Sequence, residues 1–195
     1  AWMIYRLALA IHRPPMFGHA LEIVTWHRGT RGFRSYRDFE VYQKGQKCVS
    51  ASSLWLYIDL ARKKILKVPK DVAQSYTVET DQALDLDLDR WKPEAIGPDA
   101  GADMGRVIAV RPSDYDPLGH VNNALYFEYL ETLAEPLLKA GQTVGAVTIQ
   151  YNKEISRQTD RVEAALKKHD DGYIFEFRSA EEIHAAGTFY LHPAG

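Results

Sequence analysis

The stretch Asp114-Tyr-Asp-Pro-Leu-Gly-His-Val-Asn-Asn-Ala-Leu-Tyr126 joins the end of a predicted strand to the start of a predicted long helix. An acid, a turn glycine, an imidazole and two asparagines meet where the first N–H groups of a helix have no intrahelical partner. Such a helix end favours negative charge, so it can polarise a carbonyl that is turning into an oxyanion. The same residues would also make a well-capped helix, and their spacing alone favours neither interpretation.

The residues around this stretch predict one strand, one long helix and four further strands. The helix runs from about Asn122 to Lys139 and ends at Gly141, and its apolar side chains recur at helical spacing. Pro136 removes one helical hydrogen bond, so it should kink or tighten the last turn. The predicted strands cover 106–110, 144–151, 161–168, 173–180 and 183–192.

The first part of the chain is predicted to form strands alone, at 2–11, 21–26, 33–42 and 48–60. The basic run 62–67 then leaves this sheet. Residues 79–103 are acidic and contain prolines and glycines, which is typical of a connector, and this connector could be partly ordered against a neighbour. We therefore expect two domains, with residues 1–95 holding the first half and its connector, and residues 96–195 holding the second half.

The first half has no predicted helix of its own, although the apolar face of a sheet needs cover. The chain also opens on Ala1-Trp2 rather than on a methionine. We therefore expect the first half to be incomplete because the chain lacks its natural N-terminus. The alternative is that the one long helix, or a partner subunit, covers both sheets.

Composition narrows the classes of protein that fit. Cys48 is the single cysteine of the 195 residues, so it cannot form an internal disulfide, and we expect a reducing, cytoplasmic location. The seven histidines show no metal-ligand spacing, and we expect neither a metal nor another cofactor. No apolar run reaches membrane-spanning length and no nucleic-acid recognition motif is present, so we expect neither membrane insertion nor nucleic-acid binding.

The net charge of −2 hides an uneven distribution. Residues 28–70 contain eleven Lys or Arg and three acidic residues, a balance of +8, whereas residues 96–195 contain nine basic and fifteen acidic residues, a balance of −6. A basic surface suits an acidic macromolecular partner. The candidate docking residues are Arg62, Lys63, Lys64 and Lys67. A solvated strand face that aids solubility is the simpler explanation for such a run.

The remaining histidines lie in strand or turn contexts without an acidic partner at fixed spacing, so we expect structural roles for them. We expect Cys48 to be a small buried residue. Four aromatic residues are expected in the core rather than in a ligand site. These residues are Trp26, Phe33, Phe39 and Trp55.

One strand, a long helix lying in the curl of a sheet and four more strands make up the hotdog layout. The segment 116–126 of the stretch quoted above resembles the signature of hotdog thioesterases. The first half resembles the N-terminal hotdog of the acyl-ACP thioesterases, which release fatty acids from acyl carrier protein. The matching residues there are Arg13-Pro14, Gly18, Thr25-Trp26, Tyr36-Arg-Asp-Phe39, Ala51-Ser-Ser-Leu-Trp55 and Ile58-Asp59. The resemblance implies an α+β fold, a tandem hotdog with antiparallel sheets wrapped on a long central helix and an incomplete first hotdog.

The resemblance also implies catalytic residues. The family's aspartate falls on Asp116, its histidine on His120 and the glutamate of its Glu-Cys pair on Glu154. Two positions depart from the plant pattern. The plant asparagine two residues before the histidine is Leu118, which cannot orient a water or a thioester oxygen. The plant cysteine after the glutamate is Ile155, which excludes a thiol nucleophile at that position.

The implied reaction is hydrolysis of a fatty acyl-ACP thioester, and the implied partner is an acyl carrier protein with an acyl-phosphopantetheine arm. Either Asp116 or Glu154 would activate water or attack directly, while His120 orients the attacking group and can protonate the leaving thiolate. Backbone N–H groups near the helix start would polarise the thioester carbonyl. The residues expected at this subsite are Gly119, Val121, Asn122 and Asn123.

Two other functions fit the same sequence. An acyl-CoA thioesterase of the single-hotdog type also carries the pattern Asp-x-x-Gly-His-Val-Asn-Asn, and rates on acyl-CoA and acyl-ACP would separate the two. A non-catalytic hotdog that binds acyl thioesters would explain Leu118 and Ile155 as signs of lost activity. The sequence leaves a homodimer open, because hotdog sheets pair both within a chain and between chains.

Overall fold

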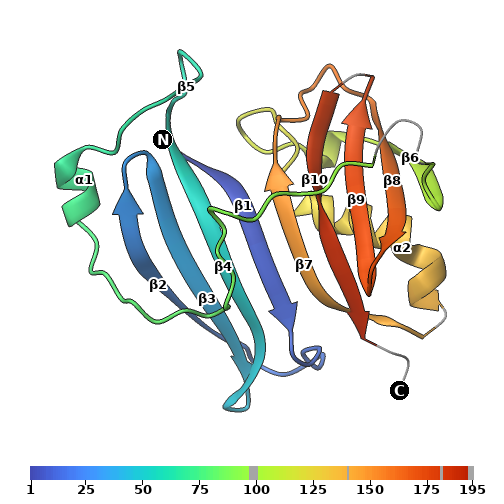
Figure 1. The fold of residues 1–195 in the computed structure, drawn as a ribbon, viewed down its shortest axis with the longest axis horizontal. Coiled ribbons are helices and arrows are strands. Elements are labelled where there is room, and N and C mark those ends of the chain that lie inside the picture. The colour runs from blue at the N-terminus through green and yellow to red at the C-terminus, as the bar shows by residue number, and fades with distance from the viewer. Residues whose placement is uncertain (97–100, 140, 181, 193–195) are drawn as a thin grey trace. The chain divides into compact units, whose positions relative to one another are not determined.

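The computed structural model of the chain describes residues 1–96, 101–139, 141–180 and 182–192 (Figure 1). The chain divides into two compact units, Ala1–Lys92 and Pro93–Gly195. The sequence placed this division between residues 95 and 96. No helix in the described ranges is long and apolar enough to cross a membrane.

The first unit contains four long antiparallel strands in the order β2-β3-β4-β1. They are β1 (Trp2–Ile11), β2 (Glu22–Arg31), β3 (Arg34–Gln43) and β4 (Gln46–Asp59). The four predicted strands are confirmed. β2 runs further than expected because a bulge between His27 and Gly29 lets the pairing continue past the glycine. Lys44 and Gly45 have φ of 53° and 71° and make the tight turn between β3 and β4.

Two short elements follow β4: β5 (Lys64–Ile65), which pairs with β4, and α1 (Lys70–Gln74). The expectation that the whole basic run leaves the sheet is therefore wrong at β5. The pairing of β3 with β4 ends where Arg34 meets Leu56, so the end of β4 has backbone groups that need partners. The returning chain supplies them, and the N–H of Leu66 donates to the carbonyl of Tyr57 at 2.9 Å.

The acidic connector lies across one face of the first sheet (Figure 1). Leu88 is buried there against Ala8, Leu54 and Leu56. The partly buried side chains that pack around this cluster are Tyr5, Tyr36, Ile58, Leu84 and Leu86. The connector therefore contributes core to the first unit, which a solvated linker would not do.

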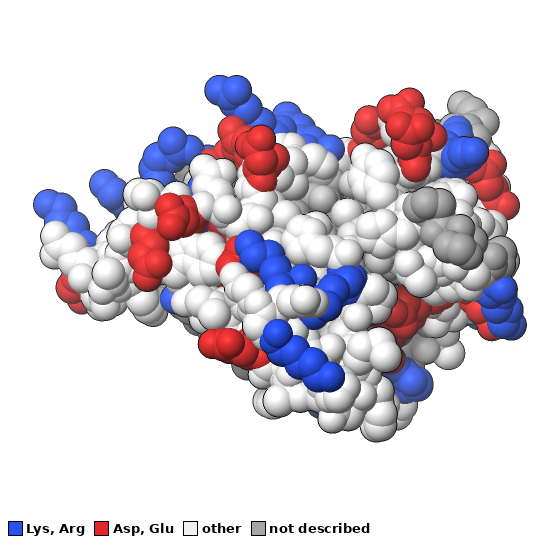
Figure 2. All heavy atoms as spheres, turned by 90° about the horizontal axis from the view of Figure 1, so that it is seen from below, with Lys and Arg blue, Asp and Glu red and all other residues white. Residues whose placement is uncertain are grey.

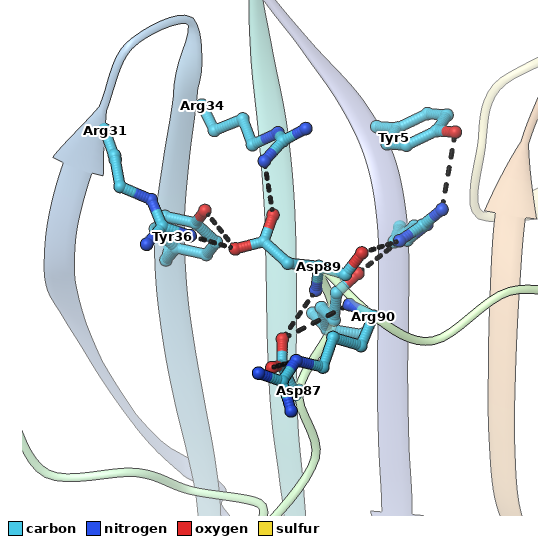
Figure 3. A network of polar contacts seen from close by, with 9 residues as sticks. Tyr5, Arg31, Arg34, Tyr36, Asp87, Asp89 and Arg90 are labelled. Carbon is cyan, nitrogen blue, oxygen red and sulfur yellow. Dashed lines mark hydrogen bonds and ion pairs between the residues drawn. The ribbon is translucent and has the colours of Figure 1, made fainter.

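Polar contacts hold the same connector, as Figure 3 shows. Asp89 accepts hydrogen bonds from the Tyr36 hydroxyl at 2.6 Å and from Arg31 at 2.8 Å. It also forms an ion pair with Arg34 at 3.0 Å. Arg6 of β1 donates to the carbonyl of Leu88, the residue before Asp89. One connector residue is thus bonded to two strands and its neighbour to a third.

The second unit repeats the strand order of the first. Its strands are β7 (Thr143–Tyr151), β8 (Arg161–His169), β9 (Gly172–Ser179) and β10 (Glu182–His192). They pair in the order β7-β10-β9-β8, just as the strands of the first unit pair in the order β1-β4-β3-β2. The second unit adds β6 (Met104–Ala109), which pairs with β8, and α2 (Leu125–Lys139), which contacts both strands. The tandem hotdog is confirmed, and the described part of the first unit has no counterpart of β6 or α2.

The helix α2 begins three residues later than expected, because residues 122–124 form the turn that caps it. Its buried side chains are Tyr126, Tyr129, Leu130, Leu133 and Ala134. The rings of Tyr126 and Tyr129 pack edge-on against Phe177 of β9, with centroids 5.9 and 6.2 Å away. This aromatic contact fixes the first turns of the helix on the sheet.

Cys48 is fully buried, as expected. The four aromatic residues expected in the core are not buried; Phe33 is 36% exposed and Trp26, Phe39 and Trp55 are half-buried. Phe39 and Trp55 alternate along β3 and β4 with Tyr36 and Leu54, which pack against the connector, so their side chains point to the opposite face of this sheet.

Candidate active site

The turn that precedes α2 is built on the buried carboxylate of Asp114, which ends the short 3-10 helix η1 (Pro112–Asp114). This residue is 1% exposed. Its carboxylate accepts hydrogen bonds from the Arg111 backbone N–H (2.9 Å), the Arg111 Nε (2.8 Å) and the Tyr129 hydroxyl (2.7 Å). Its carbonyl accepts the N–H of Asn122 at 2.9 Å. Asp114 therefore ties the residues after β6 to the start of α2.

Burial alone would raise the pKa of Asp114. The hydrogen bonds from the Arg111 N–H and the Tyr129 hydroxyl, together with the Arg111 guanidinium, outweigh burial and hold the pKa of Asp114 below its ordinary value. Asp114 is not among the residues predicted for the site from the sequence. The available signal is the segment Arg111-Pro-Ser-Asp114, in which an acid in a first turn reaches back to the N–H that precedes the turn.

Asp116 shapes the tight turn that carries His120. Its Oδ1 accepts the N–H groups of Leu118 (2.9 Å) and His120 (3.1 Å). The Asp116 carbonyl accepts the N–H of Gly119 at 2.9 Å, and the Asp116 N–H donates to the His120 carbonyl at 2.8 Å. Gly119 has φ of +83°, a left-handed conformation that glycine adopts without strain. The catalytic aspartate implied by the resemblance is thus also the residue that folds this turn.

His120 and Glu154 lie together, although 33 residues separate them in the sequence. The His120 Nε2 is 3.7 Å from the Glu154 Oε1, and their side chains are 37% and 31% exposed. Backbone pairing brings the two segments into contact, with a bridge between His120 and Ser156 and a hydrogen bond of 3.0 Å from Val121 N–H to the Ile155 carbonyl. A partly exposed imidazole beside a carboxylate can take a proton from water and return it to a leaving group.

The N–H groups expected to face a substrate carbonyl are mostly occupied. Those of Gly119, Val121 and Asn122 all donate to protein carbonyls, because the turn folds back on itself and on the segment after β7. Among the described residues, the N–H of Asn123 has no protein acceptor. In this structure it is therefore the available backbone donor among the four residues expected at this subsite.

The remaining predicted residues of this region have structural contacts. The Asn122 side chain accepts the N–H of Ala124 at 3.0 Å and so caps the helix, and the Asn123 carbonyl accepts the Tyr151 hydroxyl at 3.1 Å. A Cβ on Gly119 would lie 3.3 Å from the Arg157 Nε, so the side chain of Arg157 occupies the space that glycine leaves.

The two departures from the plant pattern lie in opposite environments. Leu118 is 66% exposed and projects from the turn, whereas Ile155 is fully buried in the core of the second unit. Neither side chain offers a polar group to a substrate. Of the residues that the resemblance implies for catalysis, the polar side chains are therefore those of Asp116, His120 and Glu154.

The predicted docking residues surround β5 and are exposed; they are Arg62, Lys63, Lys64 and Lys67. Leu60, Ile65 and Leu66 are exposed beside them, at 55%, 54% and 42%. On the face of the molecule shown in Figure 2, basic and acidic side chains are mixed and do not merge into one continuous basic surface. In the described ranges, no cluster of three or more His, Cys, Asp or Glu is arranged to hold a metal ion.

Comparisons with known proteins identify the family to which both halves of the chain are similar. The family model for the acyl-ACP thioesterase N-terminal domain matches residues 1–76, and the model for the C-terminal domain matches residues 99–188. A chloroplastic acyl-[acyl-carrier-protein] hydrolase of Cuphea viscosissima is 23% identical over 192 residues, which are 95% of this chain and 46% of the relative. A chloroplastic palmitoyl-acyl carrier protein thioesterase of Arabidopsis thaliana is 28% identical over 166 residues, which are 81% of this chain and 39% of the relative. The chain thus spans less than half the length of these curated relatives.

Solved structures show the same fold. The 12:0-ACP thioesterase from Umbellularia californica superposes with a TM-score of 0.85 at 18% identity, over 99% of this chain and 75% of that chain. An acyl-ACP thioesterase from Bacteroides thetaiotaomicron superposes with a TM-score of 0.79 at 20% identity, over 98% of this chain and 76% of that chain. At these identities the likeness establishes the arrangement of strands and helix.

Proposed function

Because the chain belongs to the acyl-ACP thioesterase family, we propose that it hydrolyses the thioester of a fatty acyl-ACP and releases the free fatty acid. The observation that carries this proposal is the pairing of His120 with Glu154 at 3.7 Å beside the start of α2. The names of the relatives support the same reaction class.

In the proposed mechanism Glu154 orients the imidazole of His120, which takes a proton from the attacking water. The imidazolium then gives this proton to the phosphopantetheine thiolate as the C–S bond breaks. Asp116 uses Oδ1 to hold the turn, and its Oδ2 provides a second carboxylate oxygen for the water. The Asn123 N–H and the positive end of α2 favour the oxyanion. The 3.7 Å separation is longer than a hydrogen bond and is expected to shorten when substrate excludes water.

Substitutions of the three side chains test this mechanism. His120→Ala and Glu154→Gln are each expected to lower kcat on acyl-ACP by about 100-fold or more, since each removes a group that moves or directs a proton. Asp116→Asn keeps an oxygen for the turn and loses the charge, so it is expected to lower kcat without lowering Tm. Circular dichroism and Tm of each variant control for misfolding. Full activity in all three folded variants would contradict the site assignment.

The substrate carrier is tested by comparing acyl-ACP with acyl-CoA of the same acyl chain. We expect a higher kcat/KM on acyl-ACP, because the basic residues around β5 offer a surface for an acidic carrier protein. A preference for acyl-CoA would favour the single-hotdog type of thioesterase. Tight binding of acyl thioester without turnover would favour a non-catalytic binding protein.

The proposal includes no cofactor and leaves a homodimer to a direct measurement of mass in solution. We place the protein in a reducing compartment on the basis of the buried, unpaired Cys48, and the cytoplasm is the location we propose. The two curated relatives described above are chloroplastic proteins.

A further inference from the structure

His184 lies at a bulge where β10 passes the end of β7. The register of β10 against β9 shifts between Ile183 and Ala185, which leaves His184 as the additional residue. Bulges re-aim side chains and are common beside active sites. The side chain of His184 turns inward, and the residue is only 2% exposed.

Both the backbone and the ring of His184 hold the segment that follows β7. Its carbonyl accepts the N–H groups of Asn152 at 2.8 Å and Lys153 at 3.2 Å. Its Nδ1 lies 3.3 Å from the Lys153 carbonyl oxygen, and its Nε2 lies 2.6 Å from the Ser179 Oγ. The next residue after Lys153 is Glu154, so these contacts end at the backbone that carries the candidate catalytic carboxylate.

These contacts require a neutral His184 ring with one donor and one acceptor nitrogen. Burial lowers the pKa of His184 below its ordinary value, and this outweighs the opposite effect of the nearby Lys153 and Glu154 backbone carbonyls. The ring is therefore neutral near pH 7, with one donor and one acceptor nitrogen. Nδ1–H donates to the Lys153 carbonyl, and Nε2 accepts the hydroxyl proton of Ser179.

We infer that His184 is a positioning residue that holds Glu154 in reach of His120, which deepens the proposed function and rests on it. A flexible glutamate side chain stays near an imidazole only if its backbone is fixed. A displacement of about 1 Å at a reacting group can cost about 100-fold in rate. The inward ring of His184 supplies this fixation from a strand that does not itself enter the site.

Two substitutions of His184 separate positioning from general stability. Asn places its amide N–H close to the position of Nδ1, so His184→Asn keeps a donor for the Lys153 carbonyl. Gln reaches the position of Nε2 and keeps the contact with Ser179 instead. We expect His184→Gln to lower kcat about tenfold or more with little change in KM, and His184→Asn to stay within about threefold of the natural chain.

A double variant tests whether His184 acts through Glu154. If it does, His184→Gln should lower the residual kcat of Glu154→Gln by no more than about twofold, because the side chain being positioned is already disabled. The matched control is His27→Gln in the first unit, which removes another buried, hydrogen-bonded histidine and should leave kcat within about twofold. Multiplicative losses in the double variant would overturn the inference.

Amide hydrogen exchange tests the contact between His184 and the segment after β7 without an activity assay. In His184→Gln, exchange across residues 152–156 should speed up about tenfold or more, with β1–β4 unchanged. Unchanged exchange in this segment would overturn the inference. A natural chain that hydrolyses no acyl thioester would instead overturn the proposed function, and the exchange measurement would still decide whether His184 holds the segment. If His184→Gln has normal kcat while Glu154→Gln is inactive, the inference about His184 is overturned and the proposed function stands.

Discussion

At the scale of single residues, two aspartates two positions apart do different work. Asp114 is buried and holds the turn to α2, whereas Asp116 is half-buried and, in the proposed function, offers its second carboxylate oxygen to the water. The sequence alone cannot assign these roles, since both acids lie in the same polar stretch. The assignment depends on Tyr129, whose hydroxyl reaches Asp114 from one turn inside the helix.

We predict that Asp114 makes stability depend on pH in the acid range. Its pKa is lower in the folded chain than in the unfolded chain, so the folded state binds fewer protons and the stabilisation is complete above the unfolded pKa. That stabilisation should be lost as pH falls from about 4 through the folded value. Urea titrations from pH 7 to pH 2 should show this loss in the natural chain and a smaller loss in Asp114→Asn.

Asp114→Ala should lower the free energy of unfolding at pH 7 by about 2–4 kcal/mol, because it leaves the buried Tyr129 hydroxyl and the Arg111 N–H without their acceptor. Tyr129→Phe provides the comparison, since it removes one of these bonds and should cost about 1 kcal/mol. Equal stability of Asp114→Ala and the natural chain would contradict the role given to this carboxylate.

At the scale of elements, the connector shows how a segment rich in prolines, glycines and acidic residues can still pack. The sequence predicts a connector that could be partly ordered against a neighbour, and Leu88 is buried in the core of the first unit. The alternation of leucine with aspartate in 84–89 lets one side pack while the other stays polar. α2 continues past Pro136 to Lys139, which is the end that the sequence predicts.

We predict that Asp89 holds the connector on the first sheet and stabilises the first unit. Asp89→Ala removes the hydrogen-bond acceptor of Tyr36 and Arg31 and the ion-pair partner of Arg34, and should lower the free energy of unfolding of the first unit by about 1–2 kcal/mol. The matched control is Asp85→Ala, which removes the same charge from an exposed position of the same connector. Denaturant unfolding monitored by hydrogen exchange in β1–β4 distinguishes the two, and equal losses would contradict the assignment.

At the scale of the whole molecule, two units with the same strand order carry different features. The basic residues around β5 belong to the first unit, whereas His120 and Glu154 belong to the second. In the proposed function, residues of the first unit therefore dock the carrier protein, and residues of the second unit hydrolyse its thioester. Substitutions that weaken docking of the carrier protein should then change KM without changing kcat.

We predict that charge reversal around β5 weakens the use of acyl-ACP. Arg62→Glu with Lys64→Glu should lower kcat/KM on acyl-ACP about tenfold at low salt with kcat unchanged, and added salt should shrink the difference. Lys92→Glu with Lys168→Glu makes the same change in net charge at exposed positions elsewhere and is the control. Identical kinetics of both double variants on acyl-ACP would show that this surface does not dock the carrier.

The elements and the candidate chemistry can be predicted from the amino-acid sequence alone. Strand alternation, the helical spacing after residue 122 and the Gly-His-Val-Asn-Asn pattern are local, so they predict the tandem hotdog and point to Asp116 and His120. Which polar groups of the candidate site remain available to a substrate depends on tertiary contacts. The turn at residues 116–122 uses its own N–H groups, the pairing of His120 with Ser156 brings Glu154 close, and His184 holds that segment from β10. The contacts of His120 with Ser156 and of His184 with Lys153 join residues far apart in the chain, and no local pattern encodes them because they arise only when the strands pack.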